Sequence, residues 1–295
     1  MRSGLAFGCG QCLPCRIDRK RIWTHRLILE GADHTDKCFV TLTYDDEHLP
    51  ADNSLVPKHA QDWLKRLRKA VEPVRLRFFL VGEYGDRTSR PHYHVALYGY
   101  PPCHRGRTDH RREYCCPSCD LILRTWSFGG VDLGELNPES ASYVAGYVTK
   151  KLTKSDEYSE EVLQGRHPEF TRMSRRPGIG GGFADEVAST LLQYNLDTPE
   201  NIPTALRHGS RIRPLGKYLR KRIAERAGID AEEVKKYNIE KAQAALQDLR
   251  ESSTANVSPG FKAFAFQQAL IDKGEGKRRR IEAMETDFKK KRSTL

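Results

Sequence analysis

Two histidines stand one residue apart in the stretch RPHYHVALYG, residues 90–99. The apolar and aromatic residues around them predict a β-strand, in which residues i and i+2 face the same way about 7 Å apart. His92 and His94 therefore project together, and one cation between them could take a nitrogen from each, because neutral imidazole is the commonest metal ligand. The alternative is that the two imidazoles are hydrogen-bonded to neighbouring groups and bind no metal.

An acidic residue is predicted to lie across a hairpin from these histidines. VRLRFFLVGEYG, residues 74–85, reads as the preceding strand, and the turn-rich GDRTSRP separates it from the strand that carries the histidines. Glu83 near the turn can then complete a mixed nitrogen–oxygen site with His92 and His94. That set of ligands suits Mg²⁺ or Mn²⁺ as well as Zn²⁺.

A pair of tyrosines follows in NPESASYVAGYVTKKL. The Asn-Pro pair at 137–138 suits a helix start, so Tyr143 and Tyr147 are predicted to share one face of a helix, one turn apart. Lys150 and Lys151 come one turn later, and nearby ammonium groups favour the phenolate of a tyrosine whose free pKa is about 10. A phenolate beside a metal that polarises a phosphate could act as a nucleophile. The alternative is that both tyrosines are packing residues.

Seven of the eight cysteines fall into two groups. The first group has the spacing C-x2-C-x2-C, and the second has an adjacent pair that continues as C-x2-C. Such clusters in a reducing compartment suggest metal binding rather than disulfides. The candidate ligands of structural zinc are Cys9, Cys12 and Cys15 in the first group and Cys103, Cys115, Cys116 and Cys119 in the second.

The ligand set and number of these zinc sites stay open. The second group could form a zinc knuckle whose fourth ligand is one of Cys115, His104 or His110. The first group needs a fourth ligand, from His25 or from the second group. It lacks the fourth cysteine of a ferredoxin-type iron–sulfur motif, because position 19 is arginine. The alternative is that the cysteines are reduced residues in loops.

The charge of the chain predicts an anionic partner. Lys and Arg number 50 against 39 Asp and Glu, a formal net charge of +11, which favours nucleic acid or an anionic membrane surface. No apolar run approaches the ~18 residues of a membrane helix, and no signal peptide is recognisable, so an intracellular protein is expected. Candidate phosphate contacts, which could equally be solvated surface residues, are Arg16, Arg19, Lys20, Arg21, Arg175 and Arg176.

The remaining elements are read from periodicity. Residues 17–30 predict a basic amphipathic helix, KCFVTLTYDD (37–46) a strand buried on both faces, and PKHAQDWLKRLRKAV (57–71) a second amphipathic helix. SFGGVDLGEL (127–136) could add a short strand. Residues 101–120 are expected to form an irregular insert that carries the second cysteine group.

The sequence changes in texture after about residue 155. RMSRRPGIGGG is a basic, glycine-rich loop without the spacing of a nucleotide-binding P-loop. Residues 230–251 predict a helix capped by Asp230, and the end of the chain is a charged run, either a frayed helix or a disordered basic tail.

Three motifs together resemble the rolling-circle replication initiators of the HUH endonuclease superfamily, in particular those of the microviruses and their gokushovirus branch. FVTLTYDD (39–46) resembles the first motif of that family, RPHYHVALYG the histidine–hydrophobe–histidine motif, and YVAGYVTKK (143–151) the nucleophile helix in its two-tyrosine form. CGQCLPCR and MSRRPGIGGG are also similar to that phage branch. The resemblance covers about residues 9–182.

The resemblance implies that His92 and His94 bind a divalent metal, Mg²⁺ or Mn²⁺, and that Tyr143 and Tyr147 are paired nucleophiles. One tyrosine would cut single-stranded DNA at the phage origin, leaving a 5′-phosphotyrosine and a 3′-OH that primes synthesis, and the other would act after one round. The absence of a P-loop then implies a separate helicase, supplied by the host together with its replication machinery. The expected location is the host bacterial cytoplasm, without membrane contact.

The fold expected from all of this is α+β. Residues 1–155 would form an HUH-like domain with a ferredoxin-like core, an antiparallel sheet flanked by helices with the histidines on a central strand. Residues 156–295 would form a basic, mainly helical region with a partly flexible tail. Two other functions remain compatible with the sequence: a non-catalytic zinc-dependent nucleic-acid-binding protein, and a metal-dependent nuclease that uses activated water.

Overall fold

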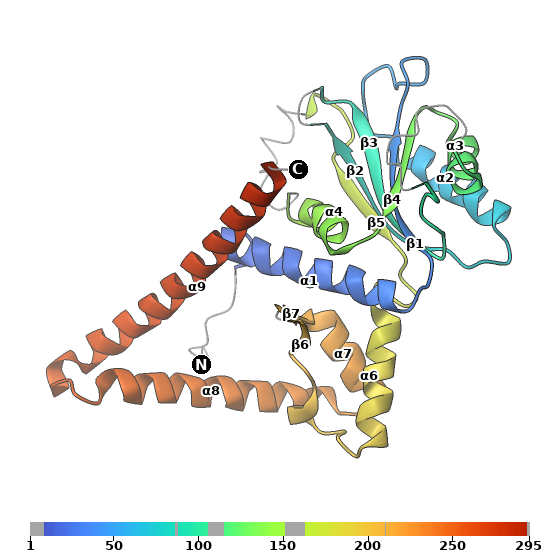
Figure 1. The fold of residues 1–295 in the computed structure, drawn as a ribbon. Helices are drawn as coiled ribbons and strands as arrows, with labels where there is room; N and C mark the ends of the chain where they lie inside the picture. The colour runs from blue at the N-terminus through green and yellow to red at the C-terminus, as the bar shows by residue number, and fades with distance from the viewer. Residues whose placement is uncertain (1–8, 86–87, 106–114, 151–162, 210, 294–295) are drawn as a thin grey trace.

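A five-stranded antiparallel sheet is the centre of the larger half of the molecule (Figure 1). The computed structural model describes residues 9–85, 88–105, 115–150, 163–209 and 211–293. The strand order is β4-β1-β3-β2-β5, so that β3 is the central strand. The α+β class, the antiparallel sheet and the central histidine strand are confirmed. The strands are β1 (Lys37–Thr43), β2 (Arg77–Tyr84), β3 (Pro91–Tyr98), β4 (Val131–Glu135) and β5 (Phe170–Met173).

Each face of this sheet is covered by two helices (Figure 1). On one face, α2 (Pro57–Ala70) and α3 (Pro117–Trp126) bury their tryptophans, Trp63 and Trp126, against the sheet. On the other face, α1 (Leu13–Ala32) and α4 (Pro138–Lys150) pack on alternate residues of the same strands. The predicted irregular insert at 101–120 therefore ends in a helix, α3, which begins at the proline that follows the adjacent cysteines.

β1 does not have two equally buried faces, as its apolar composition had predicted. Its side chains alternate, and Cys38, Val40 and Leu42 are fully buried under α2 and α3. Phe39 and Thr41 are only partly buried, because they face the side of α4, where the sheet carries polar groups.

The helix α4 begins where the Asn-Pro pair predicted. The Oδ1 of Asn137 accepts a hydrogen bond from the backbone N–H of Ser140 at 2.9 Å, and the Ser140 hydroxyl accepts one from the backbone N–H of Asn137 at 2.9 Å. This reciprocal pair satisfies donors that the first turn of a helix leaves free. Ala141, Val144 and Ala145 bury the inner stripe of the helix, so the rest of its circumference faces outward.

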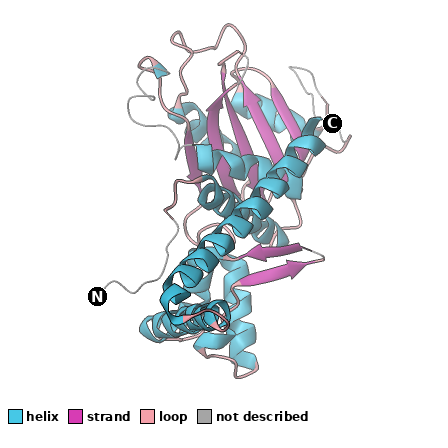
Figure 2. Cartoon of the chain, turned by 90° about the vertical axis from the view of Figure 1, so that its left-hand side faces the viewer, coloured by secondary structure: helices cyan, strands magenta, loops and turns pink. Residues whose placement is uncertain are grey.

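The region after residue 155 is less uniformly helical than predicted. β5 pairs with β2 and so completes the sheet from beyond that residue, and a two-stranded hairpin stands apart from the sheet (Figure 2). Strands of four residues, bounded by basic loops, are too short to show alternation in the sequence. The further elements are α6 (Gly181–Gln193), β6 (Ala205–His208), β7 (Arg211–Pro214), α7 (Gly216–Arg226), α8 (Ala231–Thr254) and α9 (Lys262–Ser293), with short 3-10 helices at Pro199–Asn201 and Pro259–Phe261.

The helix α1 joins the sheet to a second, smaller hydrophobic core formed by α6 and α7. Leu27 belongs to the core under α4, whereas Leu29 belongs to the second core. The guanidinium of Arg26 lies 4.0 Å from the ring centre of Trp23 and 4.3 Å from that of Tyr218, and it donates to the Ile179 carbonyl at 3.0 Å. The glycine-rich loop is therefore fixed on α1.

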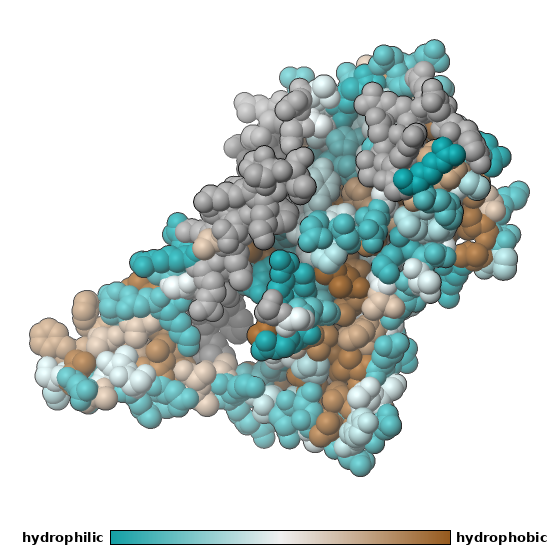
Figure 3. Space-filling model, viewed as in Figure 1, coloured by the Kyte–Doolittle hydropathy of each residue, from teal (hydrophilic) through white to brown (hydrophobic). Residues whose placement is uncertain are grey.

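The helices α8 and α9 extend away from both cores and meet at a corner (Figure 1). Asp230 caps α8 as predicted, accepting from the backbone N–H groups of Glu232 and Glu233, and the charged end of the chain is helical. The corner exposes apolar side chains, including Phe261 and Phe264, on an otherwise mostly hydrophilic face (Figure 3). No helix among the described residues is both long and apolar enough to cross a membrane.

Candidate active site

Glu83, His92 and His94 meet on the α4 side of the sheet. Glu83 is the direct cross-strand partner of His92, because the β2–β3 register places Tyr84 opposite Pro91 and Glu83 opposite His92. One ligand atom from each of the three residues lies within 4.8 Å of the others. Glu83 is 2% exposed and His94 7% exposed, while His92 is half-buried. The geometry therefore brings together the three residues that the sequence proposed as one metal site.

The remaining nitrogen of each imidazole has a partner that fixes the ring. His92 Nδ1 lies 3.2 Å from the Arg90 carbonyl oxygen, and His94 Nδ1 lies 3.0 Å from the Thr41 hydroxyl. A carbonyl can only accept, so His92 Nδ1 carries the proton and donates. With the Thr41 hydroxyl accepting in the same way, both Nε2 atoms are directed to the centre of the site, as in metal sites where an outer partner orients each histidine.

Both Nε2 atoms converge on a single oxygen of Glu83. Oε1 lies 2.7 Å from His92 Nε2 and 2.9 Å from His94 Nε2. Burial would raise the pKa of the Glu83 carboxyl, but the hydrogen bonds from His92 and His94 outweigh it and lower that pKa to about 2. Two lone pairs cannot both face a carboxylate oxygen at these distances, so positive charge must lie between them, as imidazolium protons or as a cation.

The donor set fits a divalent cation. Two imidazole nitrogens and one carboxylate form a mixed set that Mn²⁺, Mg²⁺ and Zn²⁺ accept. The second oxygen of Glu83, Oε2, is buried with no hydrogen-bond partner, and a buried carboxylate oxygen is costly to leave unpaired. This oxygen and the two Nε2 atoms are the groups that would hold the ion.

The two tyrosines lie over the histidines. The Tyr143 hydroxyl is 3.4 Å from Glu83 Oε1 and 3.4 Å from His94 Nε2. The ring of Tyr147 stacks on that of His94, with centroids 6.2 Å apart and planes inclined by 25°, and the two tyrosine rings are 5.2 Å apart. Both tyrosines are half-buried, so neither is sealed in the core.

Sequence reasoning missed two residues of this site, Phe39 and Thr41. Phe39 stacks on His94 with ring centroids 5.4 Å apart, and Thr41 holds the Nδ1 atom of the same ring. Both are odd-numbered residues of β1, on the face opposite Val40. A strict reading of alternation in FVTLT would have separated them from the buried set.

The lysines predicted to assist the tyrosines are not placed by the structure. Lys150 is the last residue of α4, but its side chain and the whole of Lys151 lie outside the described residues. Lys20 of α1 reaches the same helix instead. Its Nζ is 4.0 Å from the position that a Cβ would take on Gly146, one residue before Tyr147. An ammonium group therefore lies beside the tyrosine helix.

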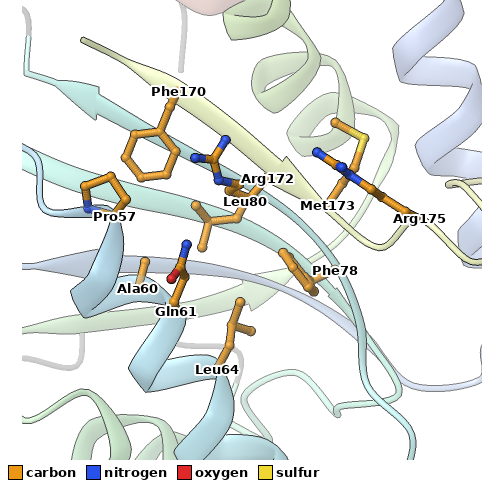
Figure 4. A pocket seen from close by; sticks show the side chains of 10 residues that line it. All are labelled: Pro57, Ala60, Gln61, Leu64, Phe78, Leu80, Phe170, Arg172, Met173 and Arg175. Carbon is orange, nitrogen blue, oxygen red and sulfur yellow. The ribbon is translucent and has the colours of Figure 1, made fainter. Parts of the chain in front are cut away.

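The other candidate phosphate contacts occupy two different places. Arg16, Arg19 and Arg21 share α1 with Lys20, and Arg21 donates to the Ile212 carbonyl at 3.3 Å. Arg175 lies on the opposite face of the sheet. There it lines a cavity of about 200 Å³ with Phe78, Phe170 and Arg172, between α2 and the edge strand β5 (Figure 4). Arg176 precedes Pro177 in the glycine-rich loop.

The cysteines form the two groups that their spacing suggested. Cys103, Cys115, Cys116 and Cys119 bring their sulfurs within 4.8 Å of one another and are buried, whereas Cys9, Cys12 and Cys15 form a separate, more exposed group. His25 does not complete the first group, because its ring nitrogens contact the Pro214 carbonyl at 2.8 Å and His208 at 2.9 Å. His110 lies outside the described residues.

Comparison with known proteins identifies relatives among phage replication proteins. Residues 37–152 match the family model of the replication-associated protein ORF2, a segment that contains the three metal-site candidates and both tyrosines. The chain is 32% identical over 190 residues to the replication-associated protein VP4 of Bdellovibrio phage phiMH2K, covering 60% of this chain and 57% of that protein. It is 36% identical over 182 residues to the replication-associated protein ORF2 of Spiroplasma virus 4, covering 58% and 55%.

A third relative extends the similarity along more of the chain. The replication-associated protein ORF4 of Chlamydia phage 1 is 29% identical over 237 residues, which cover 76% of this chain and 56% of that protein. The chain spans little more than half the length of these curated relatives. No solved structure matches it. The resemblance to phage replication proteins that the motifs predicted is confirmed.

Proposed function

We propose that this chain, a relative of phage replication-associated proteins through residues 37–152, is a site-specific endonuclease and strand-joining protein for single-stranded DNA. The observation that carries the proposal is the position of the Tyr143 hydroxyl, 3.4 Å from both Glu83 Oε1 and His94 Nε2. A phenol that only packed in the core would not be held at the centre of a cluster of metal-binding side chains.

Glu83, His92 and His94 would hold one Mg²⁺ or Mn²⁺ ion, which when bound supplies Lewis-acid polarisation of a phosphate oxygen. A tyrosine oxygen then attacks the phosphorus of a phosphodiester, and the bond to the 3′ oxygen breaks. The 3′ oxygen leaves as a hydroxyl after taking up a proton from solvent, and the phenol loses its own proton. The product is a 5′-phosphotyrosine, whose formation is reversible because the new ester bond retains the energy of the old one.

The second tyrosine allows the reaction to be repeated without releasing the first product. The rings of Tyr143 and Tyr147 are 5.2 Å apart, so a second strand could be cut while the first is still attached. The free 3′-OH from the second cut can then attack the first phosphotyrosine and join the strand into a circle. This pairing supports both initiation and termination of rolling-circle replication.

The substrate in this proposal is single-stranded DNA at the phage replication origin. The net charge of +11 supports an anionic partner. The basic side of α1 offers phosphate contacts next to the tyrosines, since Lys20 lies beside Gly146. A host helicase and host replication proteins would supply unwinding and synthesis, which places the reaction in the cytoplasm of the bacterial host.

The test is incubation with single-stranded DNA that spans the replication origin of the encoding genome, in the presence of Mn²⁺, followed by a denaturing gel. We expect a covalent protein–DNA adduct, at least 100-fold reduced in a Tyr143→Phe/Tyr147→Phe double variant. Tyr194→Phe is the matched control, because Tyr194 is 64% exposed at the end of α6, and its adduct should equal that of the unchanged chain.

Two other results would contradict the proposal. Cleavage without an adduct would identify a nuclease that uses activated water, with the tyrosines in a supporting role. Binding of the origin strand without cleavage, in a preparation that contains the bound metal, would identify a non-catalytic DNA-binding protein.

A further inference from the structure

We propose that Cys103, Cys115, Cys116 and Cys119 bind one Zn²⁺ ion as four thiolates, forming a structural site on the α3 side of the sheet. The sulfur atoms all lie within 4.8 Å of one another. Within the group, the sulfurs of Cys103 and Cys115 are 3.7 Å apart, and those of Cys116 and Cys119 are 3.4 Å apart. This site is independent of the proposed catalytic one, which lies on the other face of the sheet.

The sulfur separations match a shared ion better than a disulfide. Zinc–sulfur bonds of about 2.3 Å in a tetrahedron place neighbouring sulfurs about 3.8 Å apart. The two sulfurs of a disulfide are only about 2.05 Å apart. The separations of 3.7 and 3.4 Å lie close to the edge of the tetrahedron, and the four residues already surround a common centre.

Burial explains why these four groups need a cation. The exposed fractions of the four cysteines range from 1% to 7%. Burial and the neighbouring sulfurs raise the pKa of Cys115 and Cys119. Thiolates are the form that binds zinc, and a divalent ion at their centre would offset the repulsion that otherwise keeps them protonated.

One member of the group already favours the thiolate. Burial would raise the pKa of Cys116, but hydrogen bonds from the backbone N–H groups of Cys119 and His104 lower it to about 7. Cys116 is also the residue that precedes the first turn of α3, where the free N–H groups and the helix dipole favour negative charge. The start of α3 therefore supplies donors to the sulfurs.

The ion would fix α3 to the sheet. Tyr100 donates its hydroxyl proton to the Ser118 carbonyl at 2.7 Å at the start of the helix. At its end, Trp126 Nε1 donates to the Thr43 carbonyl at 2.8 Å, and Arg66 of α2 donates to the Thr125 carbonyl at 2.8 Å. Cys103 comes soon after the end of β3, so a four-thiolate clamp would close the chain between β3 and β4 into one unit.

The other cysteine group carries no comparable inference. Cys9, Cys12 and Cys15 are exposed or half-buried and provide three ligands, and no fourth His, Cys, Asp or Glu ligand joins them among the described residues. An experiment on zinc must therefore remove this group first, so that metal bound there is not counted.

The test uses the full chain with Cys9→Ser, Cys12→Ser and Cys15→Ser, produced with zinc in the medium and dialysed against a weak chelator. We expect one zinc and no iron per chain by elemental mass spectrometry. Adding Cys116→Ala and Cys119→Ala should remove the zinc, whereas adding Cys38→Ala should keep it, because Cys38 is a buried cysteine outside the group. Replacement by Co²⁺ should give the absorption of a tetrahedral four-thiolate site.

A conservative variant covers the case in which the alanine variant fails to fold. Cys119→His keeps four ligands, so the chain should retain one metal ion, and its Co²⁺ spectrum should shift to that of three thiolates and one imidazole. The proposal is overturned if the serine background contains no zinc, if it contains one iron instead, or if Cys119→His leaves the Co²⁺ spectrum unchanged. It is also overturned if the four sulfurs resist alkylation because they form disulfides. None of these readouts depends on DNA cleavage.

Discussion

At the scale of single residues, the arrangement of the site depends on which nitrogen of each histidine carries the proton. The Arg90 carbonyl and the Thr41 hydroxyl contact the two Nδ1 atoms at 3.2 and 3.0 Å. A backbone carbonyl cannot be removed by substitution, but the Thr41 hydroxyl can. Thr41 is therefore a positioning residue that is open to test.

We expect Thr41→Val to weaken Mn²⁺ binding by about 10- to 100-fold, the usual effect of losing an outer partner of a metal-binding histidine. Thr43→Val is the matched control on the same strand, because the Thr43 hydroxyl donates to the Gly130 carbonyl at 3.1 Å and contacts no histidine. Isothermal titration calorimetry with Mn²⁺ measures both. Equal affinities in the two variants would show that Thr41 does not orient His94.

A different histidine predicts how stability depends on pH. Burial lowers the pKa of His25 to about 4, and the hydrogen bond with the Pro214 carbonyl opposes this only in part, while His208 and Arg213 add positive charge. The unfolded chain, with a histidine pKa near 6.5, binds more protons than the folded chain between pH 6.5 and pH 4. The free energy of unfolding therefore falls as the pH is lowered through this range.

We expect His25→Gln to have a shallower loss of stability than the unchanged chain between pH 6.5 and pH 4. Urea unfolding at several pH values gives the free energies. Carboxylates that titrate in both chains cancel in the difference. Parallel curves for the two chains would mean that His25 is not held neutral in the native state.

The residue-scale outcome of the sequence analysis has a simple physical basis. Glu83, His92 and His94 were found together because strand alternation and a short hairpin fix which side chains face one another. Thr41 was missed because β1 was read as buried on both faces. The partner of the tyrosine helix on α1, Lys20, was predicted only as a phosphate contact, because helix packing brings it there and no local pattern reports it.

At the scale of elements, α4 must approach both the sheet and α1 closely enough to place its tyrosines. Its buried stripe consists of small residues around Val144, and Gly146 faces Lys20 of α1. The strand β2 has a comparable position, since Gly82 lies between Val81 and Glu83 under the ring of Phe170. These two glycines differ in the space around them.

We expect Gly146→Ala and Gly82→Ala to change stability in opposite directions. A Cβ on Gly146 would meet nothing closer than Lys20 Cε at 3.8 Å, so the variant should gain about 0.5–1 kcal/mol from helix propensity. A Cβ on Gly82 would lie 2.7 Å from Phe170 Cε1, and overpacking of this kind costs about 1–3 kcal/mol. Denaturant unfolding gives both values, and changes of the same sign would contradict the packing around one of the two glycines.

Elements were predictable from sequence where the pattern was long or well capped. The helix over 57–70 and the β2–β3 hairpin have clear periodicity, and α4 and α8 have recognisable first residues, Asn137 and Asp230. β5, β6 and β7 span only four residues each. α3 was hidden because its first turn contains a proline and a cysteine, which drew attention to metal binding instead.

At the scale of the whole molecule, the structure separates a compact part from an extended arm. The sheet and the second core share α1, and the buried residues of the second core end at Ile229. No residue of α8 is buried, and α9 continues the arm with mostly exposed side chains. The arm ends in the basic run KGEGKRRR and beyond, so its main contribution should be to DNA affinity rather than to the fold.

Removing residues 231–295 should therefore leave the sheet and the tyrosine site intact. We expect the midpoint of thermal unfolding to fall by less than about 4 °C, because about 1 kcal/mol of lost contact corresponds to 2–4 °C in a chain of this size. Adduct formation at saturating DNA should be retained. Affinity for single-stranded DNA at low salt should fall, with a shallower dependence on salt, because fewer phosphates are neutralised. Calorimetry, the adduct gel and filter binding at several salt concentrations measure the three quantities. A large drop in the unfolding midpoint would instead show that the packing of α9 on α1 is part of what holds the tyrosine helix in place, since α1 contacts both.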